Sequence, residues 1–304
     1  MSMITIMNTQ KKRILLLGAN GLLGSDLLDH IQVQYPDKIL VSYPHRSELD
    51  VLNDAALEAW IKMGWDLVIN CIGYTKVDLC ETQERDAFEL NAFFIERLAK
   101  HCERHALLLI HFSTDYVFNG SKLGMYTEED PFEPISVYGA SKAAGDRALI
   151  THCSKYFLFR VQWLYGKNGP GFPKSIARLA KEKSELCIVH DQFGSPTSTI
   201  DISKSVLSVV EIVLFQEKKI AYGTYHLRAE GICSWYEFSE HIIKVLKLDC
   251  KLIPIPSSAY PTPAKRPMNG RLSIEKYKAL GLYIPRHWQI ASTHFLTTRD
   301  LNDA

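Results

Sequence analysis

The sequence lacks the features that mark several classes of protein. Its 35 Lys and Arg residues nearly balance its 34 Asp and Glu residues. No basic field is therefore present to hold nucleic acid, and we expect no nucleic-acid partner. No hydrophobic run approaches the ~18 residues that a membrane-spanning helix needs. Seven cysteines occur without a Cys-x-x-Cys pair, which argues against a zinc site or a disulfide framework. What remains is a packed globular protein that binds a small ligand.

For the first residues we expect no secretory leader. Residues 1–10 contain neither a basic region nor a long apolar stretch, and a secretory signal has both. We expect residues 1–11 to form a flexible N-terminal extension. We also expect a cytoplasmic protein that makes no contact with a membrane.

An alternation of short apolar runs and amphipathic segments fills the first half of the chain. One helical pattern follows the first run, and another covers residues 82–105. Strands that alternate with helices are typical of a parallel sheet covered on both faces. The fold class is therefore expected to be α/β, a Rossmann-type doubly wound parallel sheet. The runs that predict its buried strands lie at residues 13–17, 39–43, 66–72, 107–112 and 156–161.

A glycine-rich turn follows the first predicted strand directly. It reads Gly18-Ala-Asn-Gly21-Leu-Leu-Gly24 and opens a helix. Gly18 permits a tight turn, Gly21 lets the backbone approach a pyrophosphate, and Gly24 lets the helix pack closely on the strand. The helix N-terminus then offers unpaired amides and a positive dipole to the phosphates. Three glycines can also serve an ordinary turn, but this position between strand and helix indicates a dinucleotide cofactor.

The end of the second predicted strand bears on the choice of cofactor. The segment His45-Arg46-Ser47 stands where an NAD-selective site usually places a carboxylate for the ribose hydroxyls. Arg46 is either a partner for the 2′-phosphate of NADP(H) or a solvated surface arginine. Asp50 and Val51 follow at a distance suited to the adenine. NADP(H) is favoured, and NAD(H) stays open.

The pattern changes after residue 165, where turn-rich segments become frequent. Residues 252–271 carry five prolines, so we expect this stretch to be largely loop. A helical pattern and an apolar run return between residues 198 and 225. We therefore expect a dinucleotide-binding domain at 12–165, completed by 198–225, and a smaller C-terminal α/β substrate lobe at 166–197 and 226–304.

Tyr138 and Lys142 form a Tyr-x-x-x-Lys pair near the start of a helix predicted at 136–150. Thr114 and Asp115 stand earlier in the chain, at the end of the fourth predicted strand. Ligands of open α/β sheets bind beyond the carboxyl ends of the strands, so these groups should converge on the cofactor. Hydride delivery to a ketone needs an acid that protonates the oxygen. Because Lys142 lies one helical turn from Tyr138, we expect its ammonium to lower the pKa of the phenol. The Thr114 hydroxyl would polarise the same carbonyl.

With these motifs the chain resembles the dTDP-4-dehydrorhamnose reductase family of extended short-chain dehydrogenases, over roughly residues 12–295. The resemblance implies reduction of the 4-keto group of dTDP-4-dehydro-L-rhamnose to dTDP-L-rhamnose, a polysaccharide precursor, with NADPH or NADH. The matching stretches are residues 18–24, 47–50, 113–118 (STDYVF), 138–142, 160–166, 191–197 (DQFGSPT) and 260–267.

The resemblance also implies roles for single residues. Tyr138 would be the proton donor, with Lys142 and Thr114 assisting it. The residues that would contact the substrate are Thr114, Asp115, Tyr116 and Trp163, although an aromatic side chain near the end of a sheet is often a core residue. The residues that would line the cofactor are Gly18, Gly21, Leu22, Leu23, Gly24, Arg46, Asp50, Val51, Gly73, Tyr74, Thr75, Phe112, Tyr138 and Lys142.

Two departures from the family pattern matter. The usual Arg-Thr-Ser-Trp run is Arg160-Val161-Gln162-Trp163 here, which leaves the exact sugar open. Some relatives bind magnesium through acidic residues at a dimer contact. Asp26 matches one such position, but Ile200 occupies another. We therefore expect no metal site, and a homodimer is left open.

Two other interpretations stay open. One is a non-catalytic, dinucleotide-binding regulatory subunit that resembles methionine adenosyltransferase β. An intact set of Thr114, Tyr138 and Lys142 favours an enzyme over it. The other is a different sugar-nucleotide enzyme, either an epimerase or a 4,6-dehydratase. Dehydratases place Glu after the Asp of the Thr-Asp pair, and Tyr116 stands there in this chain, so reduction of another 4-keto-6-deoxy sugar is the stronger form of this alternative.

Overall fold

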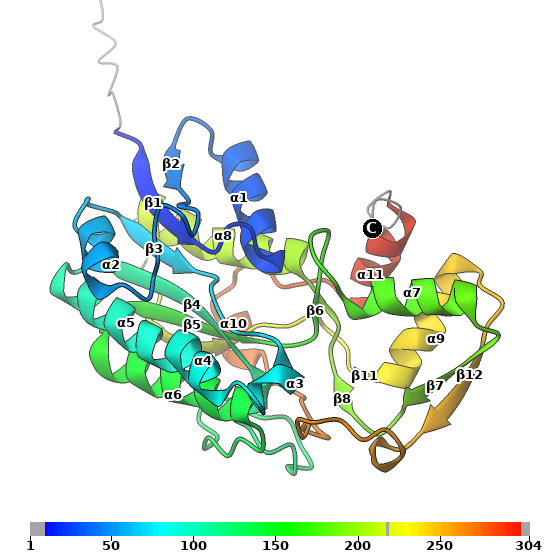
Figure 1. Cartoon of the computed structure of the whole chain (residues 1–304). Helices are drawn as coiled ribbons and strands as arrows, with labels where there is room; N and C mark the ends of the chain where they lie inside the picture. The colour runs from blue at the N-terminus through cyan, green and yellow to red at the C-terminus, as the bar shows by residue number, and fades with distance from the viewer. Residues whose placement is uncertain (1–9, 217–218, 299–304) are drawn as a thin grey trace, which may run out of the picture.

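The computed structural model describes residues 10–216 and 219–298, so residues 1–9 of the expected extension lie outside the described part. A six-stranded parallel sheet forms the centre, with the strand order β10-β5-β4-β3-β1-β2 (Figure 1). Its strands are β1 (Lys12–Leu17), β2 (Ile39–Ser42), β3 (Leu67–Asn70), β4 (Leu108–Thr114), β5 (Tyr156–Val161) and β10 (Gly223–His226). The expected Rossmann-type α/β class is confirmed. Within the described ranges, no helix combines the length and apolar composition that crossing a membrane requires.

Helices cover both faces of this sheet. On one face, α1 (Leu22–Gln34) packs against α8 (Thr199–Phe215). On the other face, α5 (Phe94–Arg104) packs against α2 (Asp54–Ile61) and α6 (Val137–His152). Two short helices, α3 (Val77–Cys80) and α4 (Glu84–Phe88), precede a π-helical turn that leads into α5. The helical pattern expected at 82–105 is thus one rod with a local irregularity.

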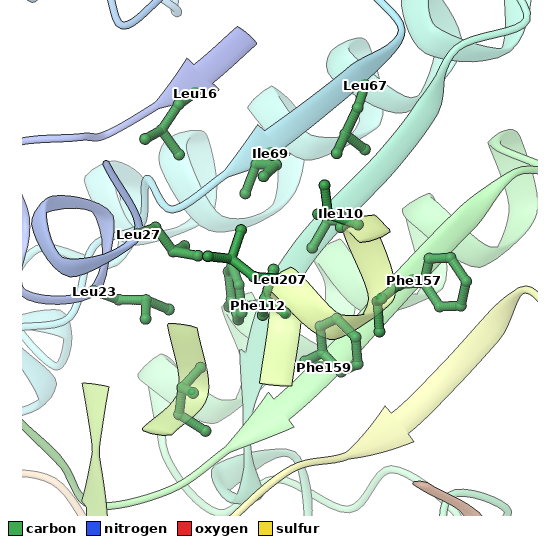
Figure 2. Close-up of a cluster of buried hydrophobic side chains, with 14 of the residues drawn as sticks. Leu16, Leu23, Leu27, Leu67, Ile69, Ile110, Phe112, Phe157, Phe159 and Leu207 are labelled. Carbon is green, nitrogen blue, oxygen red and sulfur yellow. The ribbon is translucent and has the colours of Figure 1, made fainter. Parts of the chain in front are cut away.

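The core follows from the alternation of side chains along each strand. Leu15 and Leu17 of β1 point into the cluster beneath α2 and α5, whereas Leu16 points into the cluster beneath α1 and α8. Figure 2 shows the cluster beneath α1 and α8, where Leu27 of α1 and Leu207 of α8 lie over the strands. Because both faces of the sheet are buried, the sequences of the central strands are continuous apolar runs.

The strand order reverses between β1 and β3. The chain leaves β1 for the edge strand β2 and then returns to β3 on the opposite side of β1. The loops that follow β1 and β3 therefore run in opposite directions, and a crevice opens between them at the carboxyl ends. This reversal places the candidate site.

A smaller lobe lies beside the sheet (Figure 1). Its core holds apolar side chains from α7 (Phe172–Glu182), α9 (Trp235–Leu246) and α11 (Trp288–Thr297). Three two-stranded sheets complete it: β7 (Glu185–Val189) with β12 (Lys251–Ile255), β6 (Leu164–Tyr165) with β9 (Thr197–Ser198), and β8 (Phe193–Gly194) with β11 (Cys233–Ser234). Between the segments of this lobe, α8 and β10 return to the central sheet.

Two segments differ from what the sequence predicts. Tyr277 of α10 (Glu275–Lys278) lies in the assigned lobe segment, yet it is fully buried in the core of the central sheet. The proline-rich stretch expected to be loop begins with β12, in which Pro254 pairs in register with Ile188. Proline is tolerated there because β12 is an edge strand of a two-stranded sheet.

Candidate active site

The turn after β1 needs glycine at two positions. Gly18 adopts a φ of +80°, a conformation that side chains with a Cβ rarely take. At Gly24, a Cβ would lie 2.1 Å from the carbonyl oxygen of Gly18. The first turn of α1 is therefore pressed against the strand end, and the amide of Gly21 closes the turn by donating to Gly18 O at 3.0 Å.

A cavity of about 590 Å³ opens at this turn, between the ends of β1, β2 and β3. Seven of the residues expected at the cofactor line it: Gly18, Gly21, Arg46, Asp50, Val51, Gly73 and Tyr74. Its lining also includes residues that sequence reasoning missed: Ala19, Asn20, Tyr43, Asp86, Glu89 and Leu90. Asn20 stands inside the glycine motif and was recognisable, whereas Asp86 and Glu89 reach the cavity only through the fold of α4 and the π-helical turn.

The other expected cofactor residues lie outside the lining of this cavity. Leu23 and Phe112 are buried in the sheet core, Leu22 and Gly24 belong to the first turn of α1, and Thr75 is exposed. Phe112 still contributes to the site through its backbone, because its carbonyl oxygen accepts a hydrogen bond of 2.7 Å from Lys142 Nζ.

Tyr138 and Lys142 occupy the first turns of α6, whose start is fixed by two capping contacts. The amide of Gly139 donates to Ser136 Oγ at 3.1 Å, and the amide of Val137 donates to Glu81 Oε1 at 2.9 Å. These contacts satisfy N–H groups that have no partner within the helix. The cap therefore holds Tyr138, the second residue of the helix, beside the end of β4.

Lys142 is only 5% exposed, and burial lowers its pKa to about 8, while the negative charge of Asp146 acts in the opposite direction. A Cβ on Gly73 would lie 3.9 Å from Lys142 Nζ. Because Gly73 lines the cavity, the amine reaches the edge of the space expected for the cofactor.

Tyr138 belongs to a hydrogen-bonded group with Thr114 and Asp115. Thr114 Oγ1 donates to Asp115 Oδ1 at 3.1 Å, and burial raises the pKa of Asp115 to about 7. Burial also raises the pKa of Tyr138, and a side-chain hydrogen bond with Thr114 opposes part of that rise. From the spacing of Tyr138 and Lys142, a lowered pKa was expected for the phenol. That direction is wrong because enclosure of the phenol outweighs the favourable interactions around it.

The two aromatic residues expected at the substrate take different positions. The ring of Tyr116 packs edge-on against Tyr138, with 5.3 Å between their centroids. Trp163 stacks on Trp235 of the smaller lobe at a centroid distance of 3.5 Å. A Cβ on Gly194 would lie 2.6 Å from the same indole. Trp163 is therefore held by the lobe, whereas Thr114, Asp115 and Tyr116 belong to the end of β4.

Sequence reasoning also missed a set of buried amide and imidazole groups around Lys142. Asn91 Nδ2 donates to Ser141 Oγ and to the carbonyl oxygen of Tyr74, both at 3.0 Å. His111 Nε2 lies 3.4 Å from Lys142 Nζ. These residues carry no recognisable motif, since a single His or Asn in an apolar run is usually a satisfied core residue.

The comparisons with known proteins agree with this geometry. The family model described as RmlD substrate binding domain matches residues 12–300. The dTDP-4-dehydrorhamnose reductase of Aggregatibacter actinomycetemcomitans is 36% identical over 287 residues, which cover 92% of this chain and 96% of that protein. The Escherichia coli K12 enzyme of the same name is 36% identical over 238 residues, 76% of this chain and 79% of that protein.

Solved structures give the same result. The crystal structure of dTDP-4-dehydrorhamnose reductase from Bacillus anthracis in complex with NADP has a TM-score of 0.87 and 31% identity, and the match covers 95% of this chain and 100% of that one. From the turn after β1 to the end of α11, sequence and fold therefore agree, and the chain belongs to the dTDP-4-dehydrorhamnose reductase family.

Proposed function

We propose that this protein uses NAD(P)H to reduce the 4-keto group of a nucleotide-linked 6-deoxyhexose, namely dTDP-4-dehydro-L-rhamnose to dTDP-L-rhamnose. The observation that carries the proposal is the hydrogen-bonded group of Tyr138, Thr114 and Asp115, which stands at the end of β4. The Lys142 amine lies beside it and adjoins the cofactor cavity. Relatives of this name make the same reaction class the expected one.

The residues of the cavity fit a nicotinamide dinucleotide. Gly18 and Gly21 bring main-chain amides to the cavity wall, where a pyrophosphate would meet the N-terminus of α1. Arg46 also lines this cavity and is the proposed partner of a 2′-phosphate. Asn20 Nδ2 contacts His45 Nδ1 at 3.0 Å, which ties the glycine turn to the segment that carries Arg46. NADPH is therefore the preferred donor in this proposal.

The bound cofactor supplies the hydride, and the chain supplies the proton. Because burial raises the pKa of Tyr138, its phenol is protonated at neutral pH and can give this proton to the sugar oxygen. The Thr114 hydroxyl polarises the carbonyl and can donate to the phenolate left behind. In the structure Asp115 Oδ1 accepts the single Thr114 hydroxyl proton at 3.1 Å, so that proton turns from Asp115 to the sugar oxygen for this step.

The proposed substrate contacts come from both parts of the molecule. Thr114, Asp115 and Tyr116 approach the sugar from the end of β4, and Trp163 approaches it from the smaller lobe. The charge balance of the chain supports a small ligand and no nucleic-acid partner. All seven cysteines are free, which supports a reducing compartment, and we place the enzyme in the cytoplasm.

The test is a coupled assay with a chemically identified product. The protein is incubated with dTDP-4-keto-6-deoxyglucose and NADPH, with and without a 3,5-epimerase, while NADPH absorbance is followed. We expect NADPH consumption that depends on the epimerase and yields dTDP-L-rhamnose. Tyr138→Phe should abolish turnover and retain NADPH binding. NADPH oxidation that is equally fast without the epimerase contradicts the proposed substrate.

One observation favours a second candidate, a reductase of a different 4-keto-6-deoxy sugar. Gln162 replaces a smaller family residue, and neither polar atom of its buried amide has a hydrogen-bond partner. A Cβ on Gly270 would lie 3.2 Å from Gln162 Oε1 and 2.4 Å from Asp115 Oδ2. The amide therefore adjoins the proposed sugar site. Comparison of kcat/KM over dTDP-4-keto sugars that differ in C2, C3 or C5 configuration distinguishes the two candidates.

A further inference from the structure

Trp163 has a backbone conformation that is rare for a bulky residue. Its φ is +47°, which lies in the left-handed region that mainly glycine adopts. Such a conformation persists only where the surrounding structure imposes it, and it is frequent at functional sites. Trp163 stands between β5 of the central sheet and β6 of the smaller lobe. The contacts that impose its conformation therefore lie where the two parts of the molecule meet.

Backbone contacts hold the main chain of Trp163 on its carboxyl side. The amide of Thr197 donates to the carbonyl oxygen of Trp163 at 3.1 Å. Leu164, the next residue, pairs in register with Thr197 across β6 and β9. These contacts fix the path of the chain, but they do not restrict the side-chain torsions. The orientation of the indole must therefore come from the side chains and backbone that pack against the ring.

Two neighbours from one small sheet pack against the Trp163 indole. β8 and β11 pair antiparallel, with Cys233 opposite Gly194. A Cβ on Gly194 would lie only 2.6 Å and 2.8 Å from two atoms of the indole, so the ring lies directly against the backbone of residue 194. Trp235 follows β11 at once, and its ring stacks on that of Trp163 with 11° between the two planes. The β8–β11 sheet thus provides both of these contacts.

The position of Trp235 is itself fixed by the start of α9. The amide of Glu237 donates to Ser234 Oγ at 3.1 Å, and the amide of Ser234 donates to Glu237 Oε2 at 2.6 Å. This reciprocal pair is a capping box, which satisfies two N–H groups at the beginning of a helix. Trp235 is the first residue of α9, and the ring of Phe172 packs on it with 4.4 Å between the centroids. Trp235 is therefore a rigid support for its stacking partner.

We propose that Trp235 is a positioning residue that holds the Trp163 indole in one orientation for the sugar of a nucleotide-sugar substrate. The inference deepens the proposed function and rests on it for the identity of the ligand. Offset or parallel stacking favours a restricted set of ring geometries. A ring that is already ordered before the ligand arrives adds no entropic cost of ordering to the binding step. Loss of the stack should therefore weaken binding of the sugar.

The effect should be confined to the sugar end of the site. Trp163 and Trp235 both lie outside the lining of the cofactor cavity. Tyr138 is held by the cap of α6, where the amide of Gly139 donates to Ser136 Oγ. Neither the cofactor nor the proton donor thus depends on the stack. Substitution of Trp235 should raise KM for the sugar nucleotide, with little change in kcat or in KM for NADPH.

The orientation of the indole can be tested without any substrate. The chain has five tryptophans, and nitrogen-15 labelling gives one side-chain N–H signal for each, assigned by substitution. We expect a single sharp signal from Trp163 in the wild type. In Trp235→Leu this signal should broaden or divide, because the ring then takes several orientations, while the signals of Trp60, Trp65 and Trp288 stay in place. A single sharp Trp163 signal in Trp235→Leu overturns the proposal.

The consequence for the ligand is measured by calorimetry with dTDP-L-rhamnose and with dTDP, which has no sugar. NADPH is present throughout, so no reaction takes place. In Trp235→Leu we expect Kd for dTDP-L-rhamnose to rise about three- to tenfold, and Kd for dTDP to stay the same. Trp235→Phe keeps an aromatic face and should recover most of the affinity. Equal Kd values for dTDP-L-rhamnose in the wild type and Trp235→Leu contradict the proposal.

Gly194→Ala tests the same orientation with Trp235 intact. The added Cβ, 2.6 Å from the indole, must displace the ring, so this variant should also lose affinity for dTDP-L-rhamnose and not for dTDP. Unchanged affinity for dTDP-L-rhamnose in Gly194→Ala argues against the proposal. If Trp235→Leu does not fold, Gly194→Ala and Trp235→Phe still decide the question.

A matched control is Trp288→Leu. Trp288 is 5% exposed and packs edge-on against Phe238 in the same lobe, so its loss should lower the free energy of unfolding without changing the affinity for dTDP-L-rhamnose. Equal losses of affinity in Trp288→Leu and Trp235→Leu would show a general loosening of the lobe and overturn the proposal. A wild-type protein that binds dTDP-L-rhamnose no more tightly than dTDP contradicts the proposed function, whereas the tryptophan signals still decide whether Trp235 orients the ring.

Discussion

Arg160 and Asp146 form an ion pair of 3.1 Å in which the side-chain exposures are only 2% and 0%. The pair joins β5 to α6, one helical turn beyond Lys142. The Arg160 guanidinium also lies 4.8 Å from the ring centroid of Phe132. Removal of one partner from a buried pair leaves an uncompensated charge, which costs about 3–5 kcal/mol.

We therefore expect Asp146→Leu to lower the free energy of unfolding by several kcal/mol. The double variant Asp146→Leu/Arg160→Met should recover much of that loss, because neither charge is then left alone. Chemical denaturation of the single and double variants measures the coupling. Additive losses in the double variant would show that the pair does not act as a unit.

Asp115 predicts a pH dependence of stability. Burial raises its pKa from an ordinary value near 4 to about 7, so the folded state binds a proton between these values that the unfolded state releases. The contribution of Asp115 to stability is thus lost as pH rises from about 4 to 7, by on the order of 4 kcal/mol. Unfolding free energies at pH 4.5 and 7.5 should fall less in Asp115→Asn than in the wild type. Equal pH slopes would mean that Asp115 titrates normally.

The close approach at Gly24 predicts a local defect in cofactor binding. Gly24→Ala introduces a Cβ 2.1 Å from Gly18 O, so the first turn of α1 must move away from β1. We expect NADPH affinity, measured by calorimetry, to fall by at least about tenfold. Gly124→Ala is the control, because a Cβ there meets nothing within 4 Å. An equal loss of affinity in both variants would exclude the steric explanation.

Arg46 predicts a change of cofactor preference. It lines the cavity near Asp50, and its proposed partner is a 2′-phosphate that NADH does not have. Arg46→Ala should raise KM for NADPH by about tenfold or more and leave KM for NADH nearly unchanged. Steady-state kinetics with both cofactors provides the comparison. Equal changes in the KM for NADPH and the KM for NADH would show that Arg46 does not contact the 2′-phosphate.

Gln162 predicts opposite effects on stability and on function. Its amide is buried without a hydrogen-bond partner, and such a group costs about 1–3 kcal/mol. Gln162→Met keeps the length of the side chain, so it should raise the free energy of unfolding. If the amide contacts the sugar, the same variant should raise KM for the sugar nucleotide without changing KM for NADPH. If the variant is more stable and its KM for the sugar nucleotide is unchanged, Gln162 does not contact the sugar.

The first five strands of the sheet and the two conspicuous motifs can be recognised in the sequence because each follows from local chemistry. Gly18 and Gly24 are dictated by a turn and a close packing contact, and Tyr138 precedes Lys142 by one helical turn. Their convergence follows from the rule that parallel strands end at one edge. These features need no knowledge of how distant segments pack.

The rest depends on long-range contacts that leave no local pattern. The pKa of Tyr138 is raised by burial, and the degree of burial depends on residues such as Tyr116 that pack against it. His111 resembles any core residue in a strand until Asn70 is seen opposite it. The stacking of Trp163 on Trp235 joins residues 72 positions apart in the chain. Neither sequence pattern nor residue spacing predicts the pKa of Tyr138, the neighbour of His111 or the stacking of Trp163.

The anchor of Lys142 at Phe112 is a main-chain carbonyl oxygen. Every amino acid carries that group, so no point mutation at position 112 deletes it. The aromatic ring can therefore be exchanged for another that suits the interior, while the lysine keeps its tether. The core beneath the active site can therefore change in sequence without loss of this hydrogen bond. A shift in the backbone of β4 would move the carbonyl oxygen and break it.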